Sequence, residues 1–378
     1  MSLPCPQPST DPWPVSRAGA VLTIDLDAIV ANHRRLAAQA GGATCAAVLK
    51  ADAYGVGAQQ VATALAHAGV REFLVAHVDE GISLRAWVPT DARVTVLHGP
   101  RPGAEADCAR HALRPVLNTR GQIARWREAA RLAGHPLDTA VQIDSGMSRF
   151  GLSETDIQAL ADDPRALDGL SLSLVMSHLA CADDPADPAN AAQRDRFVTL
   201  ADRLPRAPRS LAASSGIFLG DGFHFDLVRP GVALYGVAPN RVIDNPLASC
   251  VRLDAHVLQI REVGPGDGVG YGLSFRPGRP MRIGTIAVGY ADGFARRGAA
   301  AGCAWFGDIR LPVLGRISMD SMSVDLSDIP ERLLRDDMAV ELIGPHRTID
   351  DVAEAGGTIG YEILTSLGRR YHRVWHTA

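Results

Sequence analysis

The sequence predicts an α/β protein of two domains, a (β/α)8 barrel of the TIM type followed by a C-terminal, mostly-β domain. Three observations predict this fold. A chain of 378 residues is long for one domain and suggests about two. Apolar runs of strand length alternate with amphipathic helical stretches from about residue 21 to about residue 236. Beyond about residue 240 the alternation gives way to short strands separated by glycine-rich turns.

The barrel is predicted from nine apolar runs of strand length, at residues 21–26, 44–50, 72–77, 93–99, 113–118, 139–144, 171–179, 209–214 and 232–236. Helical stretches between them include residues 59–68, 120–133 and 191–204. Asp27 and Thr119 are the expected N-caps. Strands that alternate with helices form parallel βαβ units, and the eight runs after the first are enough to close a barrel. A doubly wound open sheet is the alternative, and the absence of a GxGxxG motif after the first strand disfavours it.

The second domain is predicted from the segments VRLDAHVLQIREV, MRIGTIAVGY, IRLPVLG and SMSVDL, which alternate in hydrophobicity between glycine-rich turns. We therefore expect a barrel over residues 20–240 and a β domain over residues 241–378. The first strand, 21–26, lies before the barrel and is free to pair with the β domain. Residues 1–19 are proline-rich and are expected to form a disordered tail.

Charge and composition exclude several classes of partner. The net charge of −4 offers no basic excess for nucleic acid. No apolar run approaches the roughly 20 residues that a membrane span needs. The N-terminal residues lack a charged segment followed by an apolar one, so we expect a cytoplasmic protein without a signal peptide. We expect reduced thiols and no zinc cluster, because no CxxC or CxxH pair occurs among Cys5, Cys45, Cys108, Cys181, Cys250 and Cys303.

The chain contains one lysine, Lys50, among 38 basic residues. Arginine replaces lysine well as a solvated surface charge. It cannot replace a lysine that must lose its proton and act as an amine nucleophile, because its own pKa stays above about 12. The retention of a single lysine therefore predicts amine chemistry at Lys50.

Lys50 ends a predicted barrel strand, so it should lie at the C-terminal mouth, where barrel enzymes place their active sites. Burial there would lower the pKa of the amine and prepare it to attack a carbonyl. At the far end of the barrel, Arg229 precedes Pro230 and Gly231. Backbone N–H groups of the last βα loops often bind phosphate in such barrels, and Ser214 and Gly231 are placed for this. A lysine early in the barrel and a phosphate loop late in it together predict a pyridoxal phosphate site.

At this point the chain resembles the alanine racemases. The resemblance rests on VLKADAYGVGA, IDSGMSRFG, SHLACADD, FDLVRPGVALYG, GYADG and GRISMD, in this order, and extends from residue 20 to the end. It implies a pyridoxal 5'-phosphate enzyme that interconverts L-alanine and D-alanine. It also implies a barrel followed by a β domain, and a homodimer with shared active sites.

The resemblance also implies individual roles. Lys50 is the Schiff-base lysine and one catalytic base. Tyr271, supplied by the partner subunit, is the second base. Arg229 binds the pyridine nitrogen, and His178 links Arg229 to the catalytic tyrosine. Arg149 contacts the cofactor phenolate and the substrate.

The remaining implied contacts come from both domains. Met319 holds the substrate carboxylate through its backbone N–H. The phosphate contacts are Tyr54, Ser214, Gly231, Val232 and Tyr361. The narrow substrate access is lined by Asp183, Tyr290, Arg296 and Tyr361.

Two positions depart from the family pattern. Gln142 stands where many members carry a lysine that becomes a carbamate and orients the arginine equivalent to Arg149. With one lysine in the chain that carbamate cannot form here, so a neutral amide oxygen must take its place. Ala213 stands where several relatives have asparagine, so one cofactor contact is expected to be lost.

The expected mechanism uses two bases on opposite faces of the substrate, Lys50 and Tyr271. A free tyrosine has a pKa near 10, and a cationic pair of Arg229 and His178 would favour its phenolate. Arg229 stays protonated, which leaves the ring nitrogen without a full positive charge and disfavours transamination.

Four alternatives remain at this stage. A barrel-type amino-acid decarboxylase is disfavoured by Arg229, since a carboxylate is expected there. A non-catalytic pyridoxal phosphate carrier should be a lone barrel. A zinc-dependent dehydratase has no ligand set. A serine racemase stays open, as does the choice between supplying D-alanine to peptidoglycan and degrading alanine.

Overall fold

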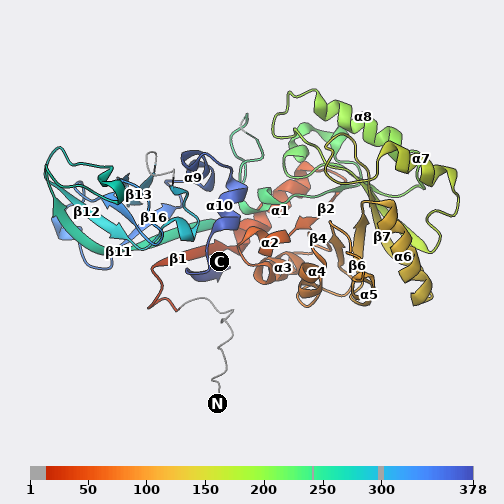
Figure 1. The fold of residues 1–378 in the computed structure, drawn as a ribbon, viewed down its shortest axis with the longest axis horizontal. Coiled ribbons are helices and arrows are strands. Elements are labelled where there is room, and N and C mark those ends of the chain that lie inside the picture. The colour runs from red at the N-terminus through yellow and green to blue at the C-terminus, as the bar shows by residue number, and fades with distance from the viewer. Residues whose placement is uncertain (1–13, 241, 297–301, 378) are drawn as a thin grey trace, which may run out of the picture. The chain divides into compact units, whose positions relative to one another are not determined.

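The structure is a computed structural model that describes residues 14–240, 242–296 and 302–377 (Figure 1). The chain divides into two compact units. One comprises residues 26–248, and the other combines the residues up to 25 with residues 249–378. The predicted tail, 1–19, is only partly described. Residues 1–13 lie outside the described residues, whereas residues 14–18 form a turn in which the amides of Arg17 and Ala18 donate to the carbonyl of Pro14 at 2.9 and 3.1 Å.

The unit of residues 26–248 is a closed barrel of parallel strands. Seven strands hydrogen-bond in chain order from β3 to β9, and β10 pairs with β2, which continues into β3 as one interrupted strand. The backbone N–H of Arg229 donates to Ala212 O at 2.9 Å and joins the last two strands. The strands are β2 Thr44–Cys45, β3 Ala47–Val48, β4 Glu72–Val75, β5 Arg93–Val96, β6 Leu113–Leu117, β7 Leu137–Gln142, β8 Leu170–Met176, β9 Arg209–Ser210 and β10 Leu227–Val228. The predicted fold class, a parallel barrel followed by a β domain, is confirmed.

One predicted barrel strand is wrong. Residues 232–236 were expected to be the eighth strand, but Val232–Tyr235 form the 3-10 helix η3, and the strand is β10, just before Arg229. A short, fully buried apolar run is compatible with either a strand or a buried helical turn, so its pattern does not distinguish them. Pro230, which lacks an N–H, interrupts the chain between β10 and η3.

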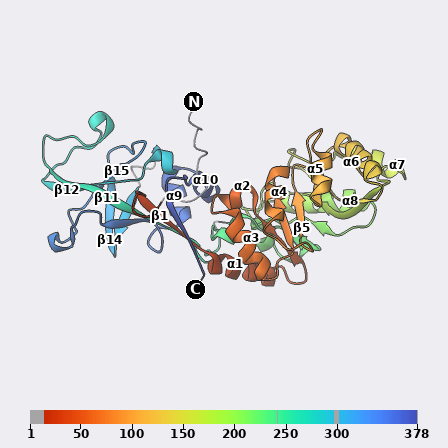
Figure 2. The ribbon, with the colours of Figure 1, turned by 90° about the horizontal axis from the view of Figure 1, so that it is seen from below.

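Helices cover the outside of the barrel, as Figure 2 shows from below. They are α1 Leu26–Gln39, α3 Ala58–His67, α4 Val78–Arg85, α5 Glu105–Arg110, α6 Arg120–Ala133, α7 Glu154–Asp162 and α8 Ala189–Ala201. Thr119 is the predicted N-cap of α6, and its hydroxyl accepts from the backbone N–H of Gln122 at 3.1 Å. Asp27 is not a cap, because α1 begins one residue earlier and places Asp27 in its first turn. Buried apolar side chains of the barrel strands, such as Val116, Leu174 and Met176, pack together in the core.

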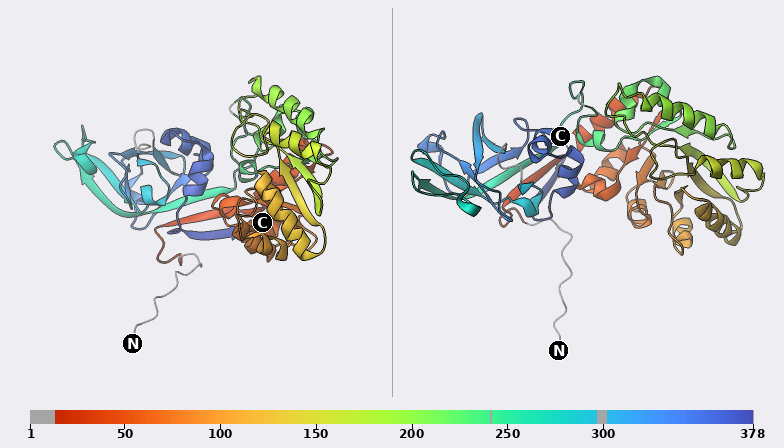
Figure 3. Two further views of the ribbon diagram at one scale, coloured as in Figure 1. Left: turned by 45° about the vertical axis from the view of Figure 1, so that its right-hand side comes forward. Right: turned by 45° about the horizontal axis from the view of Figure 1, so that its top comes forward.

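The other unit is built on an eight-stranded sheet, with the strand order β12-β15-β14-β13-β16-β11-β1-β17 in its described residues. The N-terminal strand β1 pairs antiparallel with β11 and parallel with β17, which Figure 3 shows as a red strand between teal and blue ones. The strands are β1 Ala20–Asp25, β11 Val251–Val263, β12 Met281–Ile286, β13 Cys303–Phe306, β14 Ile309–Leu314, β15 Met322–Asp325, β16 Ala339–Ile343 and β17 His372–His376. Two helices, α9 Ile349–Gly356 and α10 Gly360–Ser366, precede β17.

Helices in the described part of the chain are too short or too polar to cross a bilayer.

Candidate active site

Lys50 lies two residues beyond the end of β3, at the C-terminal end of the barrel strands, as predicted. The residues that follow Lys50 make a helical turn, α2 Lys50–Tyr54, of left-handed conformation. The φ angles of Ala51, Asp52, Ala53 and Tyr54 are 53°, 56°, 52° and 56°. Left-handed helical conformation costs about 1–2 kcal/mol for each residue with a side chain. Surrounding contacts must therefore hold this turn.

Glu80 supplies one of these contacts, and sequence reasoning missed it. Its Oε1 accepts from the backbone N–H of Ala51 at 2.7 Å, and its Oε2 accepts from those of Ala76 and His77 at 2.8 and 3.0 Å. One carboxylate thus joins the residue after Lys50 to the end of the neighbouring strand β4. The available signal was the position of Glu80 three residues after His77, where a glutamate closes the capping box of α4.

Lys50 is half-buried, and burial lowers the pKa of its amine below the ordinary lysine value. The neighbouring Arg149 cation acts in the same direction, while Glu80 opposes it. The Lys50 Nζ lies 5.9 Å from the centre of the Tyr54 ring. A lowered pKa increases the fraction of neutral amine, which is the form that attacks a carbonyl.

Tyr54, Ser214 and Gly231 lie together in the barrel. The Ser214 hydroxyl, 2% exposed as a residue, accepts from the backbone N–H groups of Gly231 and Ala233 at 3.0 and 3.2 Å. A Cβ on Gly231 would lie 2.2 Å from the Tyr54 hydroxyl oxygen, so only glycine fits here. Val232 follows at the start of η3 and is buried. Two hydroxyls and backbone N–H groups gathered in one cradle are the donors that a phosphate group requires.

Arg229 is 3% exposed and is held by the barrel backbone. Its Nη2 donates to the carbonyls of Ser177 at 2.6 Å and Leu211 at 3.3 Å, and its Nη1 donates to the Ser210 hydroxyl. Burial lowers the pKa of Arg229 to about 10, so the guanidinium remains a cation at neutral pH. Ala213, the second departure from the family pattern, forms a parallel bridge with Arg229.

His178 follows β8 and is neutral. Burial, and then the cations Arg229, Arg149 and Lys50, lower the pKa of His178 to about 3. This direction differs from the cationic pair expected from the sequence, because three neighbouring cations and a desolvated site disfavour the charged form of His178. Arg229 is the cation of this pair.

Arg149 and Gln142 are not bonded to each other. Among the described residues the Arg149 guanidinium contacts the Phe150 ring, with 5.8 Å between Cζ and the ring centre, and it makes no hydrogen bond with Gln142. Gln142 is buried at the end of β7, and Arg149 is exposed. The Phe150 ring lies 5.2 Å from His98, which lies 4.6 Å from His77. The Arg149 guanidinium therefore packs on an aromatic ring, and it does not bond the amide oxygen of Gln142 as expected.

Five predicted site residues belong to the sheet unit and are exposed within it. Tyr271, in the 3-10 helix η4 Tyr271–Leu273, is 65% exposed. Tyr290 and Met319 lie on adjacent segments, because Tyr290 N donates to Ser318 O at 2.9 Å and Ala291 N donates to Met319 O at 3.0 Å. Arg296 and Tyr361 are also exposed, as is Asp183 in the barrel unit.

Comparison with known proteins identifies the family of this chain. Residues 24–239 match the family model described as the alanine racemase N-terminal domain, and residues 250–375 match that of the alanine racemase C-terminal domain. The chain belongs to the alanine racemase family. This confirms the family expected from the sequence motifs.

Similar alanine racemases cover nearly the whole chain. The catabolic alanine racemase of Mesorhizobium japonicum is 51% identical, over 96% of this chain and 95% of the relative. The alanine racemase of Brucella canis is 44% identical, over 99% and 97%. Among solved structures, the alanine racemase of Bartonella henselae with covalently bound pyridoxal phosphate has a TM-score of 0.91 and 41% identity, covering 95% of this chain and 100% of that one. The alanine racemase of Streptomyces coelicolor has a TM-score of 0.89 and 34% identity, covering 94% and 97%.

Proposed function

We propose that this protein is a pyridoxal 5'-phosphate-dependent racemase that interconverts L-alanine and D-alanine. The observation that carries the proposal is the single lysine, Lys50, which has a lowered pKa and lies at the C-terminal end of the barrel strands. The same barrel holds a cradle of phosphate donors and a buried arginine cation. Membership of the alanine racemase family and the cofactor in the similar Bartonella structure support it.

The barrel residues fit the cofactor. Lys50 would hold it covalently, and its phosphate would be bound by Tyr54, Ser214, Gly231 and Val232, with Tyr361 from the sheet unit. Arg229 would donate to the ring nitrogen, since its guanidinium stays a cation at neutral pH even though burial lowers its pKa to about 10. The bound cofactor withdraws electrons from the amino acid and acidifies its α-proton.

The protein's own residues then move the proton. Lys50, as a neutral amine, takes or returns the α-proton on one face of the substrate, and Tyr271 does so on the other. Because the charged form of His178 is disfavoured, the positive field that favours a tyrosine phenolate would come from the neighbouring cations, chiefly Arg229, and not from His178. Because Arg229 is a donor and not a carboxylate, decarboxylation is disfavoured.

Substrate binding is assigned to both units. The Met319 backbone N–H and the Arg149 guanidinium bind the substrate carboxylate, an anion that suits a cation and a backbone donor. Asp183, Tyr290, Arg296 and Tyr361 line the access to the site. Their exposure within their own units supports this assignment.

The active form is proposed to be a homodimer in which Tyr271 completes the partner's site. Support comes from the exposure of Tyr271 and Leu273, at 65% and 51%, which leaves the phenol and a neighbouring apolar side chain accessible to a partner subunit. Mixing inactive Lys50→Ala and Tyr271→Phe chains should restore partial activity in heterodimers that carry one intact site. Heterodimers proven by mass spectrometry but without any activity would contradict shared sites.

The direct test is a substrate panel of alanine and serine enantiomers that follows chirality, carbon dioxide and keto-acid release together. We expect racemisation of alanine without the other two products, and no activity in Lys50→Ala. A faster reaction with serine would change the substrate, and carbon dioxide would indicate a decarboxylase. The name of the Mesorhizobium relative favours a role in alanine degradation. Cytoplasmic location stays a prediction.

A further inference from the structure

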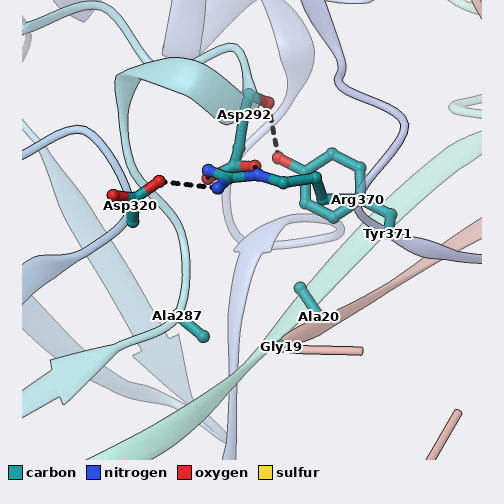
Figure 4. A pocket seen from close by; sticks show the side chains of 7 residues that line it. All are labelled: Gly19, Ala20, Ala287, Asp292, Asp320, Arg370 and Tyr371. Atoms are coloured by element: carbon teal, nitrogen blue, oxygen red, sulfur yellow. Dashed lines mark hydrogen bonds and ion pairs between the residues drawn. The ribbon is translucent and has the colours of Figure 1, made fainter. Parts of the chain in front are cut away.

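An ion-pair cluster in the sheet unit is not used by the mechanism above. Arg370, between α10 and β17, contacts two carboxylates at once (Figure 4). Its Nε and Nη2 donate to the two oxygens of Asp292 at 2.7 and 2.8 Å, and its Nη1 donates to Asp320 Oδ1 at 2.6 Å. The Asp292 side chain is 3% exposed. One guanidinium therefore connects two segments that are far apart in sequence.

Each of these carboxylates lies beside a residue assigned to the substrate. Asp292 ends the 3-10 helix η5 Tyr290–Asp292, and Asp320 follows Met319. The two segments are also joined directly, because the backbone N–H groups of Tyr290 and Ala291 donate to the carbonyls of Ser318 and Met319. The arginine thus spans the same two segments that these backbone hydrogen bonds connect.

Both carboxylate oxygens and the backbone carbonyl of Asp292 accept hydrogen bonds. Its Oδ2 accepts from the backbone N–H of Gly289 at 2.9 Å, and its carbonyl accepts from the Tyr371 hydroxyl at 2.5 Å. The packing is tight, since a Cβ on Gly289 would lie 2.3 Å from Met319 O. A Cβ on Gly293 would lie 2.7 Å from the carbonyl of Ser366, which ends the helix α10 that carries Tyr361. Three substrate-related segments therefore meet around this carboxylate.

We propose that Arg370 is a positioning residue for substrate binding, which holds the Tyr290 turn and the Met319 segment at a fixed separation through Asp292 and Asp320. The proposal rests on the substrate roles proposed for Met319 and Tyr290. Without the guanidinium, the buried Asp292 carboxylate is uncompensated and lies near that of Asp320, so the two segments repel each other. A small cavity beside Asp292, lined by Ala20 and Ala287, gives the released turn room to shift (Figure 4).

The test compares Arg370→Gln and Arg370→Lys with a matched control, Arg252→Gln. Arg252 makes the same two-bond pair with Asp254, at 2.7 and 2.9 Å, on β11 of the same unit, but Asp254 adjoins no substrate residue. Hydrogen exchange of the cofactor-loaded enzyme is measured by mass spectrometry on peptides containing Tyr290 and Ala291. Steady-state racemisation gives KM and kcat separately.

In Arg370→Gln we expect exchange at these amides to accelerate at least about tenfold and the KM for alanine to rise about 10- to 100-fold, the range that charged hydrogen bonds provide. The kcat should fall less, and the cofactor absorbance should not change. Arg370→Lys, which keeps the charge, should recover part of the protection and of the KM. Arg252→Gln should match the unmodified protein in both measurements.

Unchanged exchange and KM in both Arg370 variants would overturn the proposal. An equal effect of Arg252→Gln would also overturn it, because the loss would then be a general destabilisation. A fall in kcat with KM unchanged would exclude substrate positioning. If the unmodified protein fails to racemise alanine, the proposed function is wrong, whereas the exchange measurement still decides whether Arg370 holds the two segments.

Discussion

Gly231→Ala tests the phosphate cradle most directly. The added Cβ would lie 2.2 Å from the Tyr54 hydroxyl oxygen and 2.9 Å from its Cζ, where ordinary contact begins at about 3.4 Å. The ring must therefore move by about an ångström. It cannot swing away freely, because Tyr54 is buried, sits in the left-handed turn after Lys50 and packs on Tyr235 with 5.1 Å between ring centres.

Displacement of the Tyr54 hydroxyl removes one hydrogen bond to a charged phosphate, which is worth about 1.5–3 kcal/mol. We therefore expect the Kd for pyridoxal phosphate to rise about 10- to 100-fold in Gly231→Ala. The assay is titration of the cofactor-free protein, followed by absorbance and equilibrium dialysis. Gly42→Ala is the control, since a Cβ there meets no atom within 4 Å.

A double-mutant cycle identifies the cause of the effect. Tyr54→Phe removes the clashing oxygen and the hydrogen bond together, so Gly231→Ala should add much less in that background than alone. Fully additive losses would mean that the alanine acts elsewhere. Cofactor binding as tight in Gly231→Ala as in the unmodified protein would refute the cradle.

Three further predictions concern the remaining site residues. Borohydride reduction should label only the peptide containing Lys50, and a Lys50→Ala protein with the absorbance of a covalently held cofactor would contradict this. The rate of cofactor capture should rise with pH and level off below the ordinary lysine pKa of 10.5, because burial lowers the pKa of this amine. Tyr271→Phe should lose about 10²- to 10⁴-fold in racemisation while still exchanging the α-proton of D-alanine, measured with deuterium by mass spectrometry; an equal loss of exchange for both enantiomers would make Tyr271 structural. Activity should not respond to added bicarbonate, since Gln142 forms no carbamate, and stimulation by bicarbonate would contradict this. Phe150→Ala should raise the KM for alanine by releasing Arg149, and an unchanged KM would mean that the ring does not hold Arg149.

The sequence alone determined the barrel, the family and the lysine. Repeated alternation of buried strands with helices is a pattern of local periodicity, and it survives folding because each βαβ unit buries its own apolar face. Lys50 stood out because it is the only residue of its type. Boundaries of short buried elements were less predictable, as the run 232–236 shows, since a uniformly apolar segment satisfies either a strand or a helix.

Tertiary structure alone decided the features that depend on distant partners. The left-handed turn after Lys50 opposes the intrinsic preference of alanine and tyrosine, and Glu80, from helix α4, supplies one of the contacts that stabilise it. The charge of His178 depends on burial among Arg229, Arg149 and Lys50, which no local pattern records. The link from Arg370 to Asp292 joins residues 78 positions apart. Such contacts have no sequence period, because they join residues from distant parts of the chain that only the folded structure brings together.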